Sequence, residues 1–256
     1  MRNKVLSIVL LAMLLFSSAC TAQTSPTAAP ATAVPATEAA TAAPVTLTVM
    51  AAASLTEPFQ EIATAFEAAN PNVTVEFNFA GSQTLADQLD QGAAADVFAS
   101  ASTKYMDAAV TSGRVAADTA KAFAKNKLVV IYPKDNPAQI ATLADLVKPG
   151  IKIDLASKDV PVGNYSLTFL DNASKDATLG ATYKDDFLKN VVSYEDNVKA
   201  VLTKVSLDEA DAGIVYISDI SGDFAEKVGK LYIPDTLNSI ATYPIAPIAN
   251  SANPTV

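Results

Sequence analysis

Apolar runs of strand length alternate with helical patterns from residue 45 onward, and this alternation restricts the fold more than any other feature. The predicted strands cover residues 45–50, 73–79, 96–99, 127–132, 151–155 and 211–216. Apolar residues recur at helical spacing in residues 54–69, 82–91, 183–190 and 195–205, and in the run that follows Pro161. Strands that alternate with helices are typical of an α/β fold with a mainly parallel sheet.

The N-terminus has the features of an export signal. Arg2 and Lys4 precede an apolar run over residues 5–16, which is too short to span a membrane. We therefore predict a signal peptide over residues 1–20. Cys20, the only cysteine, stands where a bacterial lipoprotein signal is cut and its cysteine acylated, so this segment resembles a lipobox. An ordinary signal with a chance cysteine is the alternative interpretation.

Residues 21–44 consist almost entirely of Thr, Ala and Pro with a few polar residues. Such a segment has too little apolar surface to offset the entropy lost on ordering, so we predict a disordered linker. It would tether a folded part that begins at Val45. That part is long enough for one large domain or two small lobes.

Charge and composition exclude several classes of function. The net charge of −9 argues against nucleic acid or an anionic membrane surface as a partner. The chain has no histidine, which removes the usual general base and the commonest transition-metal ligand. We find no phosphate-binding loop, no dinucleotide fingerprint and no acidic spacing of a calcium loop. We therefore predict a protein that is not an enzyme.

Three predicted helix starts carry residues that could face a ligand: Ser54, Ser82 and the segment 161–163. Each follows a predicted strand, and in open α/β sheets ligands bind where strands end and helices begin. A helix N-terminus offers free N–H donors and about half a positive charge, which favours an anion. The simpler interpretation of each serine is an N-cap, and Ser54 with Glu57 has the spacing of a capping box.

Six segments, in this order, resemble the ModA family, the substrate-binding proteins of bacterial molybdate ABC transporters. They are "AAASL" (51–55), "FAGSQTL" (79–85), "GAAADVFASA" (92–101), "KLVVIYPK" (127–134), "VPVGNY" (160–165) and "GIVYISD" (213–219). The resemblance implies a two-lobed, type II-like periplasmic-binding-protein fold with two crossings, near Lys127 and near Asp219. Residues 45–126 and 220–256 would form the first lobe, and residues 127–219 the second.

The resemblance also implies a site in the cleft between the lobes, where neutral donors alone bind an oxyanion. Carried over by position, the ligand-binding residues are Ser54, Ser82, Val162, Val198 and Tyr216. The spacing before Val198 is longer than the family pattern, so Asn197 and Lys199 are alternatives to it. Ser100 and Ser102 are expected to pack beside the cleft.

The function that the resemblance implies is that of an extracytoplasmic receptor, which delivers molybdate or tungstate to the permease of an ABC importer. We expect a monomer, anchored to the membrane through Cys20, with no cofactor and with the metal bound only as its oxyanion. Another tetrahedral oxyanion such as sulfate is the alternative ligand. The family pattern continues past residues 241–248 into a final helix, whereas this sequence ends at Val256. We therefore expect an exposed apolar strip on the first lobe.

Overall fold

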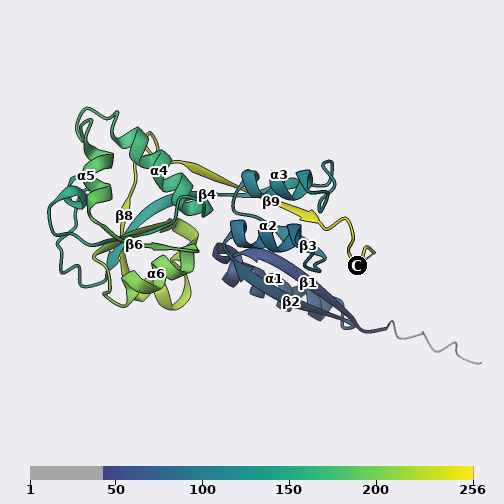
Figure 1. Cartoon of the computed structure of the whole chain (residues 1–256). Helices are drawn as coiled ribbons and strands as arrows, with labels where there is room; N and C mark the ends of the chain where they lie inside the picture. The colour runs from purple at the N-terminus through teal and green to yellow at the C-terminus, as the bar shows by residue number, and fades with distance from the viewer. Residues whose placement is uncertain (1–42, 256) are drawn as a thin grey trace, which may run out of the picture. The chain divides into compact units, whose positions relative to one another are not determined.

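Strand β4 (Lys121–Pro133) joins two sheets in the computed structural model, which describes residues 43–255 (Figure 1). Up to Lys127, β4 pairs with β9 (Ile240–Pro247) in the first sheet. From Leu128 onward it pairs with β7 (Ala212–Tyr216) in the second sheet. The first crossing between the two halves therefore lies inside a continuous strand.

The first sheet has the strand order β2-β1-β3-β9-β4. Its parallel core consists of β1 (Val45–Ala52), β2 (Val73–Ala80) and β3 (Val97–Ala99). The helices of this half are α1 (Thr56–Ala69), α2 (Ser82–Asp90) and α3 (Thr103–Thr111). We call this sheet with its three helices the first lobe.

The second sheet has the order β4-β7-β5-β6, and β8 (Val228–Tyr232) pairs with the other edge of β4. Its parallel core consists of β7, β5 (Ile153–Ala156) and β6 (Val191–Glu195). The helices of this half are α4 (Pro161–Ala173), α5 (Tyr183–Lys189) and α6 (Val198–Ser206). We call this sheet with its three helices the second lobe.

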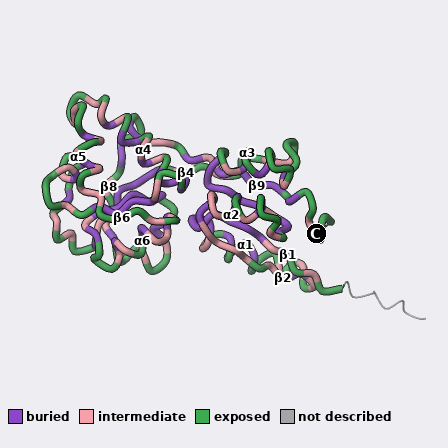
Figure 2. Tube along the Cα trace, viewed as in Figure 1, coloured by how far each residue is buried: buried purple, intermediate pink, exposed green. Residues whose placement is uncertain are grey.

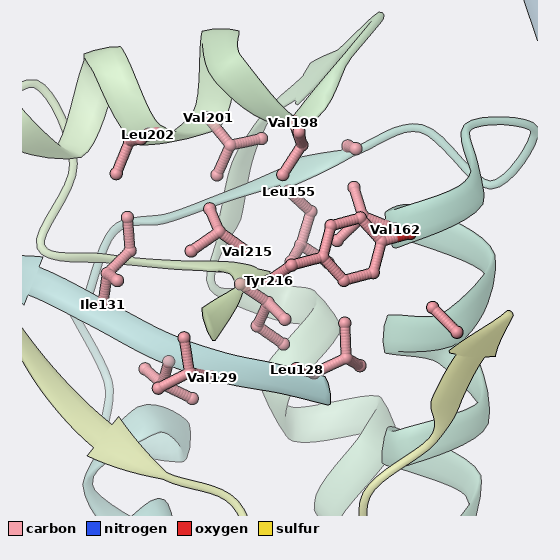
Figure 3. Packing of buried hydrophobic residues seen from close by; sticks show 14 of the residues in the cluster. Leu128, Val129, Ile131, Leu155, Val162, Val198, Val201, Leu202, Val215 and Tyr216 are labelled. Atoms are coloured by element: carbon pink, nitrogen blue, oxygen red, sulfur yellow. The ribbon is translucent and has the colours of Figure 1, made fainter. Parts of the chain in front are cut away.

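The second lobe has a continuous apolar core. Strands β5 and β7 are buried along their whole lengths, as expected of parallel strands covered on both faces. Figure 2 shows buried residues gathered inside the lobe that contains β6 and α6, with exposed residues around its rim. Figure 3 shows Val201 and Leu202 of α6 against the strand residues Val215 and Leu155. In the first lobe, a second cluster lies between the sheet and helices α2 and α3 and includes Leu85, Leu89, Phe98 and Met106.

The six predicted strands are all present, but the predicted second crossing near Asp219 is wrong. Strand β8 pairs with β4 in the second sheet, so the chain returns to the first sheet only between Tyr232 and Ile240. Strands β6 and β8 and helix α3 were not predicted. Four short 3-10 turns complete the described elements: Ala53–Leu55, Leu143–Val147, Ile217–Asp219 and Gly222–Glu226.

An exposed apolar groove runs along the first lobe between α1 and the sheet. It measures about 370 Å³ and is lined by apolar residues of α1, β1, β2, β3, β4 and β9, among them Phe59, Ile62, Phe66, Phe77 and Phe123. Ile62 is 59% exposed and Phe123 is 43% exposed. The face that α1 covers is therefore only partly shielded from solvent.

The predicted signal peptide, Cys20 and nearly all of the predicted linker lie outside the described residues. Within residues 43–255, no helix combines the length and the apolar character that crossing a membrane would require.

Candidate functional site

The five residues expected to bind a ligand all line one small cavity between the lobes. Ser54 and Ser82 reach it from the first lobe, and Val162, Val198 and Tyr216 from the second. The other lining residues are mostly small or apolar: Ala52, Ala53, Ala80, Gly81, Ala101, Val160, Pro161 and Asn197. Among residues 43–255, no lysine, arginine, aspartate or glutamate lines the cavity.

The parallel strands explain why residues so far apart in sequence meet here. In the first lobe, β1 and β2 run side by side until Ala52 pairs with Ala80, and a helical turn follows each strand. Their C-terminal ends, with the turns that carry Ser54 and Ser82, therefore share one edge of the sheet. The alanines at these strand ends leave space that larger side chains would fill.

Ser54 is not the N-cap that its capping-box spacing predicted. It lies in the 3-10 turn Ala53–Leu55, Leu55 occupies the N-cap position of α1, and no side chain caps that helix. The Ser54 hydroxyl instead lies 3.0 Å from the hydroxyl of Tyr243 on β9. The serine is 3% exposed, so its hydroxyl lies away from bulk water, beside both the tyrosine and the cavity.

Ser82 likewise does not cap its helix, because its side chain bonds to the backbone of Ala101. It is the first residue of α2, after Gly81 at the N-cap position. Its Oγ accepts a hydrogen bond from the backbone N–H of Ala101 at 3.0 Å. Because this bond uses a lone pair, the hydroxyl hydrogen of Ser82 is left for a group in the cavity.

Two helix N-termini of the second lobe meet at the cavity. Val162 follows Pro161, the first residue of α4, and Val198 is the first residue of α6. N–H groups of a first helical turn have no partner within the helix, and the helix dipole adds positive potential there. The Asn197 side chain accepts from the N–H of Ala200 and so caps α6.

Tyr216 ends β7 with its ring beside Val162 and Val198 (Figure 3). It is 1% exposed, and its hydroxyl has no hydrogen-bond partner among the described residues. Burial, and secondarily the neighbouring Tyr243, raises the pKa of the Tyr216 phenol well above its usual value. The phenol therefore stays protonated and offers a donor to the cavity.

One buried carboxylate lies behind this lining. Asp219 accepts the backbone N–H of Tyr216 at 2.9 Å, and its other oxygen lies 4.0 Å from Nζ of Lys199. Complete burial raises the pKa of Asp219 to about 7, and the nearby Lys199 charge opposes that shift. Lys199 itself does not line the cavity, because it forms an ion pair with Glu57.

Ser100 and Ser102 lie beside the cavity and not in its lining. Ser100 Oγ donates to the carbonyl of Ser102 at 2.7 Å, and Ser102 Oγ caps α3 by accepting from the N–H of Lys104. The sequence did not predict the roles of Tyr243 and Asn126. The Tyr243 hydroxyl contacts Ser54, and Asn126 contacts that hydroxyl in turn. Tyr243 lies in "ATYPIAPI" and Asn126 in "KNKL", and neither segment carries a local pattern that indicates a contact near Ser54.

Within residues 43–255, no group of three or more acidic, histidine or cysteine side chains could hold a metal ion. The lining offers neutral donors: three hydroxyl groups and the N–H groups of helix starts. Such a set matches an anion whose oxygens all accept hydrogen bonds.

Comparison with known proteins identifies the relatives of this chain. Residues 47–256 match the model of a family described as bacterial extracellular solute-binding proteins. The chain is 39% identical over 208 residues to the molybdate-binding protein ModA of Mycobacterium tuberculosis (strain H37Rv), which covers 81% of this chain and 74% of the relative. It is 34% identical over 216 residues to ModA of Escherichia coli (strain K12), covering 82% and 80%.

Solved structures share the fold. A substrate binding domain assigned to a molybdenum ABC transporter from Clostridium difficile is 31% identical, with a TM-score of 0.59 over 82% of this chain and 88% of that one. The sulfate-binding protein SubI of Mycobacterium tuberculosis has a TM-score of 0.72 at 17% identity, over 82% and 78% of the chains. These neighbours confirm the predicted two-lobed α/β fold of periplasmic binding proteins.

Proposed function

The chain belongs to the ModA family of bacterial extracellular solute-binding proteins, and on that premise we propose that it captures molybdate or tungstate between its lobes. It would deliver the oxyanion to the permease of an ABC importer, without a cofactor and without chemistry of its own. The observation that carries this proposal is the lining of the cavity. Three hydroxyl groups and two helix starts converge there, and no charged side chain in the described part of the chain does.

The number of donors accounts for tight binding without a lysine or arginine. The hydroxyls of Ser54, Ser82 and Tyr216 and the N–H groups of Val162 and Val198 supply five hydrogen bonds, and the N–H groups of the two serines bring the count to seven. Each bond to a charged acceptor contributes roughly 1.5–3 kcal/mol, which offsets the cost of removing the anion from water. A net binding free energy near 10–12 kcal/mol, or a nanomolar-scale Kd, is the expected outcome.

The same lining accounts for selectivity against protonated anions. Molybdate, tungstate and sulfate present only acceptor oxygens at neutral pH, so every oxygen can meet a donor. Hydrogen phosphate carries one O–H group, which would face other donors and remain unpaired at a cost of about 1–3 kcal/mol. The size of the cavity would then decide among the tetrahedral anions that carry no proton.

Calorimetric titration with molybdate, tungstate, sulfate and phosphate tests the proposal. We expect molybdate and tungstate to bind with Kd values at least about a hundredfold lower than those of sulfate and phosphate, which equals about 2.7 kcal/mol. The double variant Ser54→Ala/Ser82→Ala should lose most of this affinity. Ser102→Ala is the matched control, since it removes a buried hydroxyl that does not line the cavity.

Two outcomes decide against the proposal. Full affinity in the double variant would remove the site from this cavity. Sulfate binding that equals or exceeds molybdate binding would favour the alternative, a receptor for sulfate with the same arrangement of donors.

We also propose that the mature protein works as a monomer held outside the cytoplasm by a lipid on Cys20. The signal-like residues 1–20 and the Ala/Thr/Pro-rich residues 21–44 support an anchor and a tether. Membrane fractionation tests this, because Cys20→Ala should move the protein from the membrane fraction to the soluble fraction. Unchanged fractionation would rule out the lipid anchor.

A further inference from the structure

A chain of hydrogen bonds leads from the junction of the two sheets into the cavity. Asn126, on β4 beside that junction, places Nδ2 3.4 Å from the hydroxyl of Tyr243. The Tyr243 hydroxyl in turn lies 3.0 Å from Oγ of Ser54, which lines the cavity. Tyr243 is 2% exposed, so its hydroxyl is shielded from bulk water.

The direction of this chain is fixed at its outer end. The Asn126 Oδ1 accepts the backbone N–H of Lys127 at 3.0 Å, and an amide NH₂ group could not occupy that position. Nδ2 must therefore face the other side. There its two hydrogens match two acceptors, Oγ of Ser218 at 2.7 Å and the Tyr243 hydroxyl.

The remaining hydrogens follow from counting. The Tyr243 oxygen accepts from Asn126, and if it also accepted from Ser54 its own buried hydrogen would have no acceptor among the described residues. Tyr243 therefore donates this hydrogen to Ser54. Burial raises the pKa of Tyr243, and its hydrogen bonds with Ser54 and Asn126 act in the opposite direction, so the phenol keeps this hydrogen. The Ser54 oxygen accepts it, which leaves the serine hydrogen to point into the cavity.

We propose that Asn126 and Tyr243 are positioning residues that hold the Ser54 hydroxyl as a donor toward the bound oxyanion. This inference rests on the proposed function. Ser54 would otherwise be free to rotate and to accept a hydrogen bond from an anion that carries a proton. The pair thereby adds to the discrimination against hydrogen phosphate, although neither residue lines the cavity.

Two substitutions distinguish the loss of these hydrogen bonds from a reversal of their donor–acceptor direction. Tyr243→Phe removes the hydroxyl and releases Ser54. Asn126→Asp replaces the amide donor with a carboxylate that accepts from Tyr243, so the tyrosine then accepts from Ser54. In that variant the serine lone pairs, and not its hydrogen, face the anion.

Ser218→Asp is the matched control for charge. Ser218 is exposed and bonded to the same Nδ2, so this variant adds a carboxylate beside Asn126 without changing the direction of the chain. Any repulsion of the oxyanion by the added charge appears in both variants. The difference between Asn126→Asp and Ser218→Asp therefore reports on hydrogen-bond direction.

The experiment is calorimetric titration of the full chain and its variants with molybdate, together with the thermal shift produced by millimolar phosphate. We expect Tyr243→Phe to bind molybdate about 5–20-fold more weakly and to gain a phosphate shift that the wild type lacks. Asn126→Asp should bind molybdate at least about tenfold more weakly than Ser218→Asp.

Equal losses in Asn126→Asp and Ser218→Asp, or an unchanged ratio of molybdate to phosphate binding in Tyr243→Phe, would overturn the inference. The two proposals fail in different ways. A wild-type chain that binds neither molybdate nor tungstate ends the proposed function and this inference with it. A wild-type chain that binds one of them, with variants that keep its selectivity, ends this inference alone.

Discussion

Nζ of Lys199 lies 2.7 Å from Oε2 and 2.8 Å from Oε1 of Glu57, and this ion pair joins α6 of the second lobe to α1 of the first. The two side chains are 18% and 35% exposed, so the pair is shielded only in part from solvent. A second contact crosses the same boundary, because Nε2 of Gln83 donates to the backbone carbonyl of Asp196 at 2.7 Å. Both contacts exist only while the lobes are together.

Removing the charge of Glu57 should weaken ligand binding without changing selectivity. Partly exposed ion pairs contribute about 0.2–1 kcal/mol, so Glu57→Gln should raise the Kd for molybdate about two- to fivefold. The difference from the wild type should shrink at high ionic strength because salt screens the pair. Titrations at low and high salt measure both effects. Asp171→Asn, which breaks the 2.7 Å pair with Lys184 inside the second lobe, should leave the Kd unchanged.

Gly81 should tolerate no side chain when the lobes are closed. A Cβ at this position would lie 2.5 Å from the carbonyl oxygen of Asp196, across the boundary between the lobes. Its φ of −60° and ψ of 140° suit alanine, so the clash and not backbone strain is the cost. Overpacking of this kind costs about 1–3 kcal/mol, so Gly81→Ala should weaken molybdate binding about 5–150-fold.

The control for Gly81→Ala is a glycine with the opposite properties. Gly180 has a φ of +89°, and a Cβ there would meet nothing within 4 Å. Gly180→Ala should lower the Tm of the unliganded protein and leave the Kd unchanged. Gly81→Ala should raise the Kd and leave the Tm of the unliganded protein unchanged. An unaltered Kd in Gly81→Ala would mean that ligand binding does not require the closed arrangement.

The buried carboxyl of Asp154 should make stability fall with rising pH. Asp154 is fully buried with no hydrogen-bond partner for either oxygen among the described residues, and burial, then the charge of Glu195, raises its pKa to about 7. Between the unfolded value of 3.8 and this value, the folded state holds a proton that the unfolded state has lost. From about pH 5 to about pH 7 this group removes about 2–3 kcal/mol of unfolding free energy.

Asp154→Asn removes this titration. The Tm of the variant relative to the wild type should therefore rise by roughly 5–10 °C between about pH 5 and about pH 7. Asp185→Asn, at an exposed position of α5, should track the wild type at both pH values. A constant difference in Tm between Asp154→Asn and the wild type would show that this carboxyl does not titrate in the folded protein.

The apolar groove of the first lobe should bind hydrophobic dyes. Ile62 on α1 lines the groove and is 59% exposed. Ile62→Gln should lower dye fluorescence and reduce self-association measured by light scattering, with molybdate affinity unchanged. Val192→Gln is matched in exposure at 59% but lies on β6 of the second lobe, and it should leave dye binding as it is. Equal effects of both variants would show that the groove has no special role.

Sequence patterns predicted the inner strands well because these are buried and apolar. Strand β6 was missed for the opposite reason: its residues alternate between half-buried and exposed, so it offers no apolar run. Helix α3 was missed because only Met106 and Ala109 are buried among its nine residues, and alanine adds little to a periodic pattern. The second crossing was placed too early because β8 lacks a signal that assigns it to either sheet.

At the candidate site, the sequence pattern predicted the helix starts that carry the two serines, but it did not predict the residue that bonds to Ser54. Ser54 and Ser82 follow strands at positions where small residues precede a helix, which the sequence displays directly. The contact between Ser54 and Tyr243 joins residues separated by 189 positions. Only the three-dimensional pairing of β9 with its neighbours brings that tyrosine beneath the serine, so no local pattern could have shown that Ser54 is not a cap.

The position of β9 between β3 and β4 also constrains when this protein can fold. Its neighbours are translated more than a hundred residues earlier, and their facing edges stay unpaired until residues 240–247 arrive. A closing step that depends on such distant segments is slow. Until residues 240–247 have been made, the nascent chain therefore lacks the strand that completes its first lobe.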